Sequence, residues 1–260
     1  MTLPKIAHLR KAQTGQSALP LMMRFLKHAV ALSLITTCLL VAPGASQQMR
    51  DDLLLKVDHL VYATPDLAAG VEKAERLLGV KAVPGGQHPG GGTRNALIRL
   101  GETSYLEIIG PDPDQPKPLR PRRFTIDDLK APRLVTWAAK SADLETIVEN
   151  ARKLGVDLGR VQAGSRNRPD GVLLSWRLTV SPELTGDGLV PFFIDWGKTA
   201  HPAANLPKDC SLVAIRAVHP DAKHIQAELS ALGLKLRVDA GSAPALIATI
   251  RTPKGEVELR

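Results

Sequence analysis

Cysteines, aromatic residues and the motifs of several enzyme classes are scarce in this sequence. Of its two cysteines, only Cys210 lies outside an apolar segment near the amino terminus; without that segment the chain forms no internal disulfide and no cysteine metal cluster. Aromatic residues make up 3% of the chain, which argues against the base-stacking surface of a single-stranded nucleic-acid binder. No G-x-S-x-G, P-loop or H-E-x-x-H motif occurs, so serine-nucleophile, nucleotide-phosphate and zinc-peptidase chemistry lack support.

Acidic residues are absent from residues 1–50, and this absence explains most of the formal net charge of +8. Removing residues 1–44 removes five basic residues and leaves +3, from 29 basic and 26 acidic residues. The basic balance therefore belongs to one end of the chain and does not indicate a nucleic-acid partner.

That end of the chain is similar to a secretory signal. Arg24 and Lys27 precede the mostly apolar run from Ala29 to Ala42, which is shorter than the about 20 residues of a membrane-spanning helix. We expect residues 1–45 to be a signal peptide with an amino-terminal extension. The protein would then be exported, periplasmic or secreted, with no stable membrane span once the leader is removed. An uncleaved anchor is the alternative.

Three segments repeat one order of elements. HLVYATPDL starts at His59, TWAAKSADL at Thr136 and AIRAVHPDA at Ala214, and helical periodicity follows each of them. An acidic residue seven positions after each start is suited to cap the helix, at Asp66, Asp143 and Asp221. A glycine suited to the left-handed position ends each helix, at Gly79, Gly155 and Gly233.

Three short strand-like runs follow each predicted helix. The repeating unit is therefore strand-helix-strand-strand-strand, over residues 55–111, 132–197 and 211–260. Proline-rich segments connect the units. The sequence predicts an α+β fold of repeated βαβββ modules.

Polar side chains interrupt the apolar strands at a few places. His59 lies on the first strand of the first module, where a histidine is either a hydrogen-bonded core residue or a cavity residue. In the last strands, Glu107 shares a face with Tyr105, and Asp195 shares one with Phe193. Because carboxylates rarely go buried without a partner, we expect these strands to line a common polar cavity that His59 also faces.

The chain resembles the vicinal oxygen chelate superfamily, which includes glyoxalases, extradiol dioxygenases and bleomycin-resistance proteins. The βαβββ repeat carries this resemblance, with histidine on the first strand and glutamate on the last. The stretches HPGGGTRNALIRLG, SYLEIIGPDP, PRLVTWA, PDGVLLSWRL and PFFIDWG are similar to its glyoxalase-like domain subgroup, over residues 57 to about 202. The resemblance implies a domain at 55–197, whose two modules form one cleft, plus a third, C-terminal half-unit at 211–260.

The resemblance also implies a divalent metal held by the first and last strands of each module. By position the ligands would be His59, Glu107, Thr136 and Asp195. The neutral hydroxyl of Thr136 is a poor ligand, so the expected metal set is His59, Glu107 and Asp195, with Zn²⁺, Mn²⁺, Fe²⁺ or Ni²⁺ as the cation. A metal-free pocket with a hydrogen-bonded His59–Glu107 pair is the alternative.

Five further side chains are candidates for substrate contacts: His88, Arg94, Asn95, Arg177 and His201. Those in the glycine-rich stretch 87–95 would equally serve as turn residues. Arg177 and Trp176 alternate along a strand, so only one of them points into the cavity. We interpret Trp176 and Trp196 as core residues, and residues 165–171 as a solvated hairpin turn.

These expectations lead to two functional hypotheses. The first is a glyoxalase-like lyase, isomerase or dioxygenase acting on a small carbonyl or vicinal-oxygen compound, with Glu107 and Asp195 as catalytic carboxylates. The second is a metal-free protein that binds and sequesters a small molecule in the same cleft. Either way the partner is a small-molecule ligand, and paired modules are also compatible with a homodimer.

Overall fold

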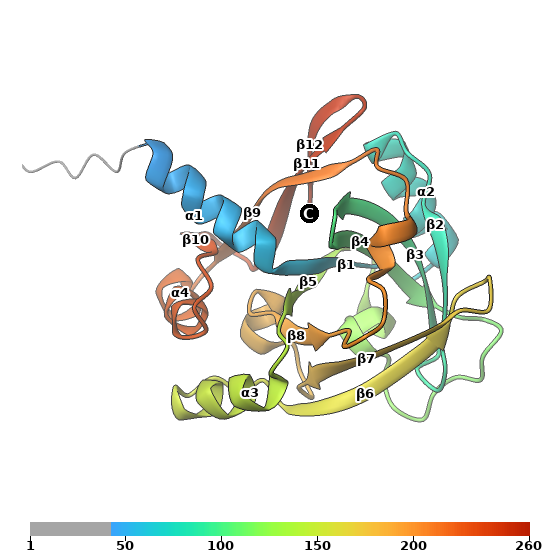
Figure 1. Cartoon of the computed structure of the whole chain (residues 1–260), viewed down its shortest axis with the longest axis horizontal. Coiled ribbons are helices and arrows are strands. Elements are labelled where there is room, and N and C mark those ends of the chain that lie inside the picture. Colours follow the sequence, from blue (N-terminus) through green and yellow to red (C-terminus); the bar gives the residue numbers. More distant parts are fainter. Residues whose placement is uncertain (1–42) are drawn as a thin grey trace, which may run out of the picture. The chain divides into compact units, whose positions relative to one another are not determined.

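The structure is a computed structural model that describes residues 43–260 (Figure 1). The predicted leader lies outside the described residues except for its last three positions, so export and cleavage stay predictions. Those three positions belong to α1 (Pro43–Lys56), a helix that the sequence analysis did not predict. In the described part, no helix is both long enough and apolar enough to cross a membrane.

Three βαβββ units follow α1 in the predicted order. The first contains β1 (Val57–Ala63), α2 (Leu67–Leu78), β2 (Val83–His88), β3 (Thr93–Gly101) and β4 (Ser104–Pro111). The second contains β5 (Arg133–Lys140), α3 (Leu144–Lys153), β6 (Arg160–Asn167), β7 (Leu173–Val180) and β8 (Phe192–Asp195). The third contains β9 (Ser211–His219), α4 (Ala222–Ala231), β10 (Arg237–Ala240), β11 (Ala245–Thr252) and β12 (Gly255–Leu259). Short 3₁₀ helices lie in the connections: η1 (Arg123–Asp128), η2 (Thr185–Gly188) and η3 (Pro202–Asn205).

The three module helices begin and end where the sequence predicts. The N-cap side chains accept hydrogen bonds from the backbone N–H three residues later, and these caps are Asp66, Asp143 and Asp221. A glycine with positive φ follows each helix, at Gly79, Gly155 and Gly233. Local chemistry alone therefore sets the helix boundaries.

The first two modules share one eight-stranded sheet, in the order β2-β3-β4-β1-β5-β8-β7-β6. Within each module the first strand pairs in parallel with the last, and β1 and β5 join the modules in antiparallel fashion. His59 pairs with Ala138 and Val61 with Thr136 across this junction. A two-fold axis between the modules exchanges these two pairs. His59 of the first module therefore corresponds to Thr136 of the second, and Val61 corresponds to Ala138.

The eight-stranded sheet curls until its two outer strands, β2 and β6, touch (Figure 1). The Arg166 guanidinium donates a hydrogen bond to the Gly85 carbonyl at this seam. A Cβ on the neighbouring Gly86 would collide with the Asn167 carbonyl, so glycine permits the close approach. The inner face of the curled sheet thereby becomes the wall of a cup.

The third module forms a separate four-stranded sheet, in the order β10-β9-β11-β12. Its first strand pairs in parallel with its second strand and antiparallel with its third. The order of elements therefore repeats, but the strand pairing of the first two modules does not. Residues of this sheet, among them Ile215 and Ile250, belong to the same buried cluster as Leu60 and Trp137 of the first two modules.

Candidate functional site

A pocket of about 230 Å³ opens on the inner face of the curled sheet. The first module lines it with polar side chains from β1, β3 and β4, including His59, Asn95, Tyr105 and Glu107. The second module lines it mainly with Arg166, Trp176 and Phe192. Both modules therefore build one cleft, as the family resemblance implies.

A β-bulge in β1 places two consecutive polar side chains together. Val57 pairs with Ala139 and His59 pairs with Ala138, which leaves Asp58 as the extra residue. The Asp58 carboxylate consequently reaches the ring of its neighbour, with Oδ1 2.7 Å from Nδ1 of His59.

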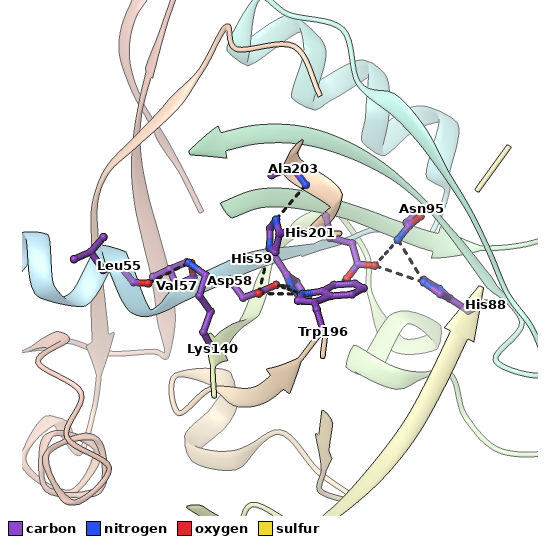
Figure 2. Close-up of polar contacts among 11 residues, drawn as sticks. Leu55, Val57, Asp58, His59, His88, Asn95, Lys140, Trp196, His201 and Ala203 are labelled. Carbon is purple, nitrogen blue, oxygen red and sulfur yellow. Dashed lines mark hydrogen bonds and ion pairs between the residues drawn. The ribbon is translucent and has the colours of Figure 1, made fainter. Parts of the chain in front are cut away.

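The buried Asp58 carboxylate accepts two more hydrogen bonds (Figure 2). Trp196 Nε1 lies 3.1 Å and His201 Nε2 3.2 Å from Oδ2. Burial alone would raise the pKa of Asp58, but the hydrogen bonds from His201 and His59 outweigh it and lower the pKa to about 2. Asp58 is therefore ionised at neutral pH.

The protonation of His59 follows from this ionised neighbour. An ionised carboxylate only accepts hydrogen bonds, so Nδ1 of His59 carries the proton directed at Asp58. In the neutral ring, Nε2 then keeps its lone pair, and it lies 3.8 Å from Oε2 of Glu107. Tyr105 stacks on the same ring at 4.7 Å and holds its orientation.

Glu107 lies between His59 and His88. Its Oε1 accepts a 2.6 Å hydrogen bond from Asn95 Nδ2 and lies 3.7 Å from Nε2 of His88. Burial would raise the pKa of Glu107, but His59, His88 and the Asn95 hydrogen bond together hold it below its usual value. Burial lowers the pKa of His88, so Glu107 is ionised while His88 is neutral.

The structure brings four of the eight predicted site residues together and leaves four elsewhere: Arg94, Arg177, Asp195 and His201. His59, His88, Asn95 and Glu107 line the pocket. Arg94 instead forms an ion pair with Asp114, and Arg177 with Glu145, both outside the pocket. His201 contacts Asp58 rather than the cavity.

Two interpretations of the second module need correction. Trp176 and Trp196 line the pocket rather than only filling the core, because their side chains face the inner side of the sheet. Residues 165–171 are not wholly a solvated turn, because β6 continues to Asn167 and buries Arg166 in the pocket wall. Sequence reasoning also missed Asp58, although an acid directly before His59 was a readable signal.

Asp195 does not lie with Glu107, contrary to the expectation of a shared cavity. Residues alternate along β8, so Phe192 and Ile194 face the pocket while Asp195 faces away from it. The Asp195 carboxylate instead accepts a 2.8 Å hydrogen bond from the N–H of Gly197.

The strand register identifies the residue that corresponds to Glu107. Val61 of β1 pairs with Glu107, and its equivalent Ala138 of β5 pairs with Phe192. Phe192 therefore occupies the position in the second module that Glu107 occupies in the first. Its ring meets the His59 ring edge-on at 5.5 Å.

The residues present do not fit the metal set that the resemblance implies. The four equivalent positions hold His59, Glu107, Thr136 and Phe192, so the second module offers one hydroxyl and no strong ligand. The Asn95 amide donates toward both His88 and Glu107, where a metal would need free lone pairs. Across residues 43–260, no three His, Cys, Asp or Glu side chains are grouped to hold a metal ion.

One comparison with a solved structure shows the fold, and two weaker matches accompany it. A hypothetical protein from Staphylococcus aureus matches with a TM-score of 0.59 at 15% identity, over 77% of this chain and 92% of that one. Methylmalonyl-CoA epimerase from Mycobacterium tuberculosis matches with a TM-score of 0.38 at 19% identity, over 56% and 90%. The Streptomyces coelicolor enzyme of that name matches with a TM-score of 0.37 at 22% identity, over 54% and 95%.

Sequence comparisons identify the family. No curated protein matches the chain significantly. The family model described as a glyoxalase-like domain matches residues 57–233, which span the first two modules and reach past α4 of the third. That range is more than half of the chain. The protein therefore belongs to the glyoxalase-like domain family of the vicinal oxygen chelate superfamily.

Proposed function

We propose that this protein is an enzyme that moves a proton at the carbon beside a carbonyl group, in a small compound bound in the pocket. One observation carries the proposal. The lone pair on Nε2 of His59 faces the cavity, while Nδ1 is fixed 2.7 Å from the ionised carboxylate of Asp58. A general base needs this fixed tautomer and orientation.

The two carboxylates around His59 favour the protonated ring that such a step creates. Nε2 takes the proton from carbon, and the carbon–hydrogen electron pair moves toward the carbonyl oxygen to form an enolate. The resulting imidazolium lies between Asp58 at 2.7 Å and Glu107 at 3.8 Å. Return of a proton to the same carbon restores the carbonyl, and return to the opposite face yields the epimer where that carbon is a stereocentre.

The walls of the pocket limit the size and hydration of the substrate. The aromatic rings of Tyr105, Trp176 and Phe192 form an apolar part of the pocket wall beside His59. The cavity has a volume of about 230 Å³. This volume is below the ≈300–1,000 Å³ of drug-sized ligand sites, so a small compound is favoured. A dioxygenase reaction would need a metal, and the donor set does not fit one.

Hydrogen–deuterium exchange followed by ¹H NMR tests the proposal directly. We expect the full chain to accelerate loss of the proton signal beside the carbonyl of hydroxyacetone or 2-oxobutanoate in D₂O. His59→Gln should lower that rate by about 100-fold, the usual contribution of a general base. Chelator should leave the rate unchanged. His224→Gln, an exposed histidine on α4, is the matched control and should behave like the wild type.

A binding protein is the second candidate, favoured by Thr136 and Phe192 at the positions equivalent to His59 and Glu107. The same experiment separates the two. If compounds that bind exchange no faster with the wild type than with His59→Gln, the enzyme proposal fails and sequestration is supported. Export through the predicted leader and formation of a homodimer remain part of the proposal; cell fractionation and light scattering test them.

A further inference from the structure

We infer that Arg166 binds the carboxylate of the substrate, so that the ligand is a small 2-oxo acid or a close analogue with two adjacent oxygens. The inference rests on the proposed function and names the class of compound that would enter the same pocket. Arg166 lies on β6, is 3% exposed, and lines the cavity on the side of the second module.

The buried charge of Arg166 lacks a counterion. A guanidinium taken out of water is costly unless an anion accompanies it. Among the described residues, no carboxylate lies within ion-pair distance of Arg166, and its one hydrogen bond goes to the neutral carbonyl of Gly85. Burial accordingly lowers the pKa of Arg166, although nearby Tyr105 and Glu107 oppose this.

Another buried arginine shows how this chain treats such a charge elsewhere. Arg99 is 4% exposed and donates to the Glu102 carboxylate at 2.6 Å and to the Ala203 carbonyl at 3.1 Å. Its burial is thus compensated within the protein. Arg166 is equally buried and lines a cavity. An anion that enters this cavity from solution would balance the positive charge of Arg166.

The shape of the guanidinium selects the kind of anion. Its planar fork of N–H groups binds two oxygens side by side, as in bidentate carboxylate pairs. In a 2-oxo acid the carboxylate and the neighbouring carbonyl supply such oxygens. An enolate formed at the carbonyl would then develop its negative charge beside a positive group. Arg166 would thereby place a positive charge beside the substrate oxygens without a metal ion.

Neighbouring residues are consistent with this assignment. A Cβ on Gly164 would lie 2.6 Å from Trp176 Nε1, so glycine lets the indole lie against β6 beside Arg166. Arg123 is exposed and lines the cavity, with its guanidinium 4.8 Å from the Phe124 ring. It adds a second positive charge where an anion would enter.

Isothermal titration calorimetry with an acid and its amide tests the inference. The probes are 2-oxobutanoate and 2-oxobutanamide, which share a shape and differ in charge. We expect the full wild-type chain to bind the acid about tenfold or more tightly than the amide. Arg166→Gln should abolish this preference by weakening the acid and leaving the amide unchanged. Arg166→Lys, which keeps the charge, should retain part of the preference.

Arg168→Gln is the matched control, because Arg168 lies on the same hairpin, pairs with Asp170 at 2.6 Å and does not line this pocket. Equal affinity for acid and amide, a preference that survives in Arg166→Gln, or no binding of either probe at millimolar concentration would each overturn the inference. If Arg166→Gln does not fold, as judged by circular dichroism, the lysine variant and the wild-type ratio decide. His59-dependent exchange in 2-oxobutanamide would keep the proposed function standing even then.

Discussion

At the residue scale, Asp58 determines how the imidazole of His59 is used. Three donors, His59, His201 and Trp196, converge on one buried carboxylate. Trp196 and His201 lie 138 and 143 residues after Asp58, so the site forms only when the fold is complete. The group that orients the base is therefore also a group that links β1 to the segment after β8.

Asp58→Asn should remove a pH-dependent part of the stability. The folded pKa of Asp58 is about 2, below its ordinary value of 3.8. The unfolded chain therefore binds the proton first as the pH falls. The stabilisation is present above pH 3.8 and is lost as the pH falls toward 2. At neutral pH the variant should be less stable by about 2 kcal/mol, and urea unfolding should show this gap closing in acid. A gap that does not depend on pH would contradict the assignment; exposed Asp51→Asn is the control.

How far the sequence predicts the site differs from residue to residue. His59 and Glu107 stand out because a polar group in an apolar strand needs a partner, and this reasoning placed both in the cavity. Arg166 did not stand out, since its neighbours Arg168 and Asp170 make the segment read as a solvated turn. Its burial depends on contact with β2, about 80 residues earlier, which no local pattern encodes.

At the scale of elements, the seam between β2 and β6 is the feature that closes the cup. Gly86 has φ of +136° and its missing side chain faces the Asn167 carbonyl. The seam is made of glycine backbone on one strand and of Arg166 and Asn167 on the other. Its geometry controls both the width of the pocket and the position of the guanidinium.

Gly86→Ala should open this seam. The new methyl group meets backbone, and the residue's φ is unfavourable for alanine, so we expect destabilisation of about 1–3 kcal/mol by urea unfolding and weaker binding of 2-oxobutanoate. Gly91→Ala, in the turn after β2, is the matched control for stability, because its Cβ would have ordinary contacts of 3.4 Å or more. Equal stability of the two variants would show that β2 and β6 do not need this approach.

Element boundaries were more predictable than strand register. The capping acids and left-handed glycines act within a few residues, so the sequence alone fixes where helices start and stop. The register of β8 depends instead on pairing with β5 and β7. That strand has four residues, and its flanking turns carry no signal that separates one alignment from another. The sequence analysis therefore assigned Asp195 to the position that corresponds to Glu107, where the sheet places Phe192.

At the scale of the whole molecule, one hydrophobic core connects the third module to the first two. Leu60, Trp137 and Ile250 belong to a single buried cluster that crosses both sheets. We therefore propose that residues 211–260 unfold together with residues 55–197. Tryptophan offers a clean probe, because all three tryptophans, Trp137, Trp176 and Trp196, lie in the second module and its following segment.

Ile250→Ala tests this coupling. Ile250 is fully buried in the third sheet, and its truncation should cost about 2–5 kcal/mol. If unfolding is cooperative, tryptophan fluorescence in urea should report the whole loss, although no tryptophan lies in the mutated module. Arg251→Ala, on the exposed face of the same strand, should leave the midpoint unchanged. If Ile250→Ala does not change the urea midpoint measured by tryptophan fluorescence, the third module folds on its own.

The overall architecture was predicted from the repeat, except for the pairing within the third module. Strand-helix-strand-strand-strand describes all three units, but that order permits either the fourth or the second strand to lie beside the first. The order of elements alone does not decide between these two pairings. A repeated order of elements therefore predicts which helices and strands form, but it does not by itself predict which strands pair.

The internal two-fold relation between the first two modules also bears on how such a site diverges. In a symmetric pair of separate identical chains, any change at a site position would appear twice. In a single chain, Thr136 can differ from His59 and Phe192 from Glu107 without altering the other half. The first module therefore places His59 and Glu107 in the cleft, while the second places Thr136 and Phe192 at the equivalent positions. In such an arrangement a substitution in the second module can reshape the cavity without changing His59 or Glu107.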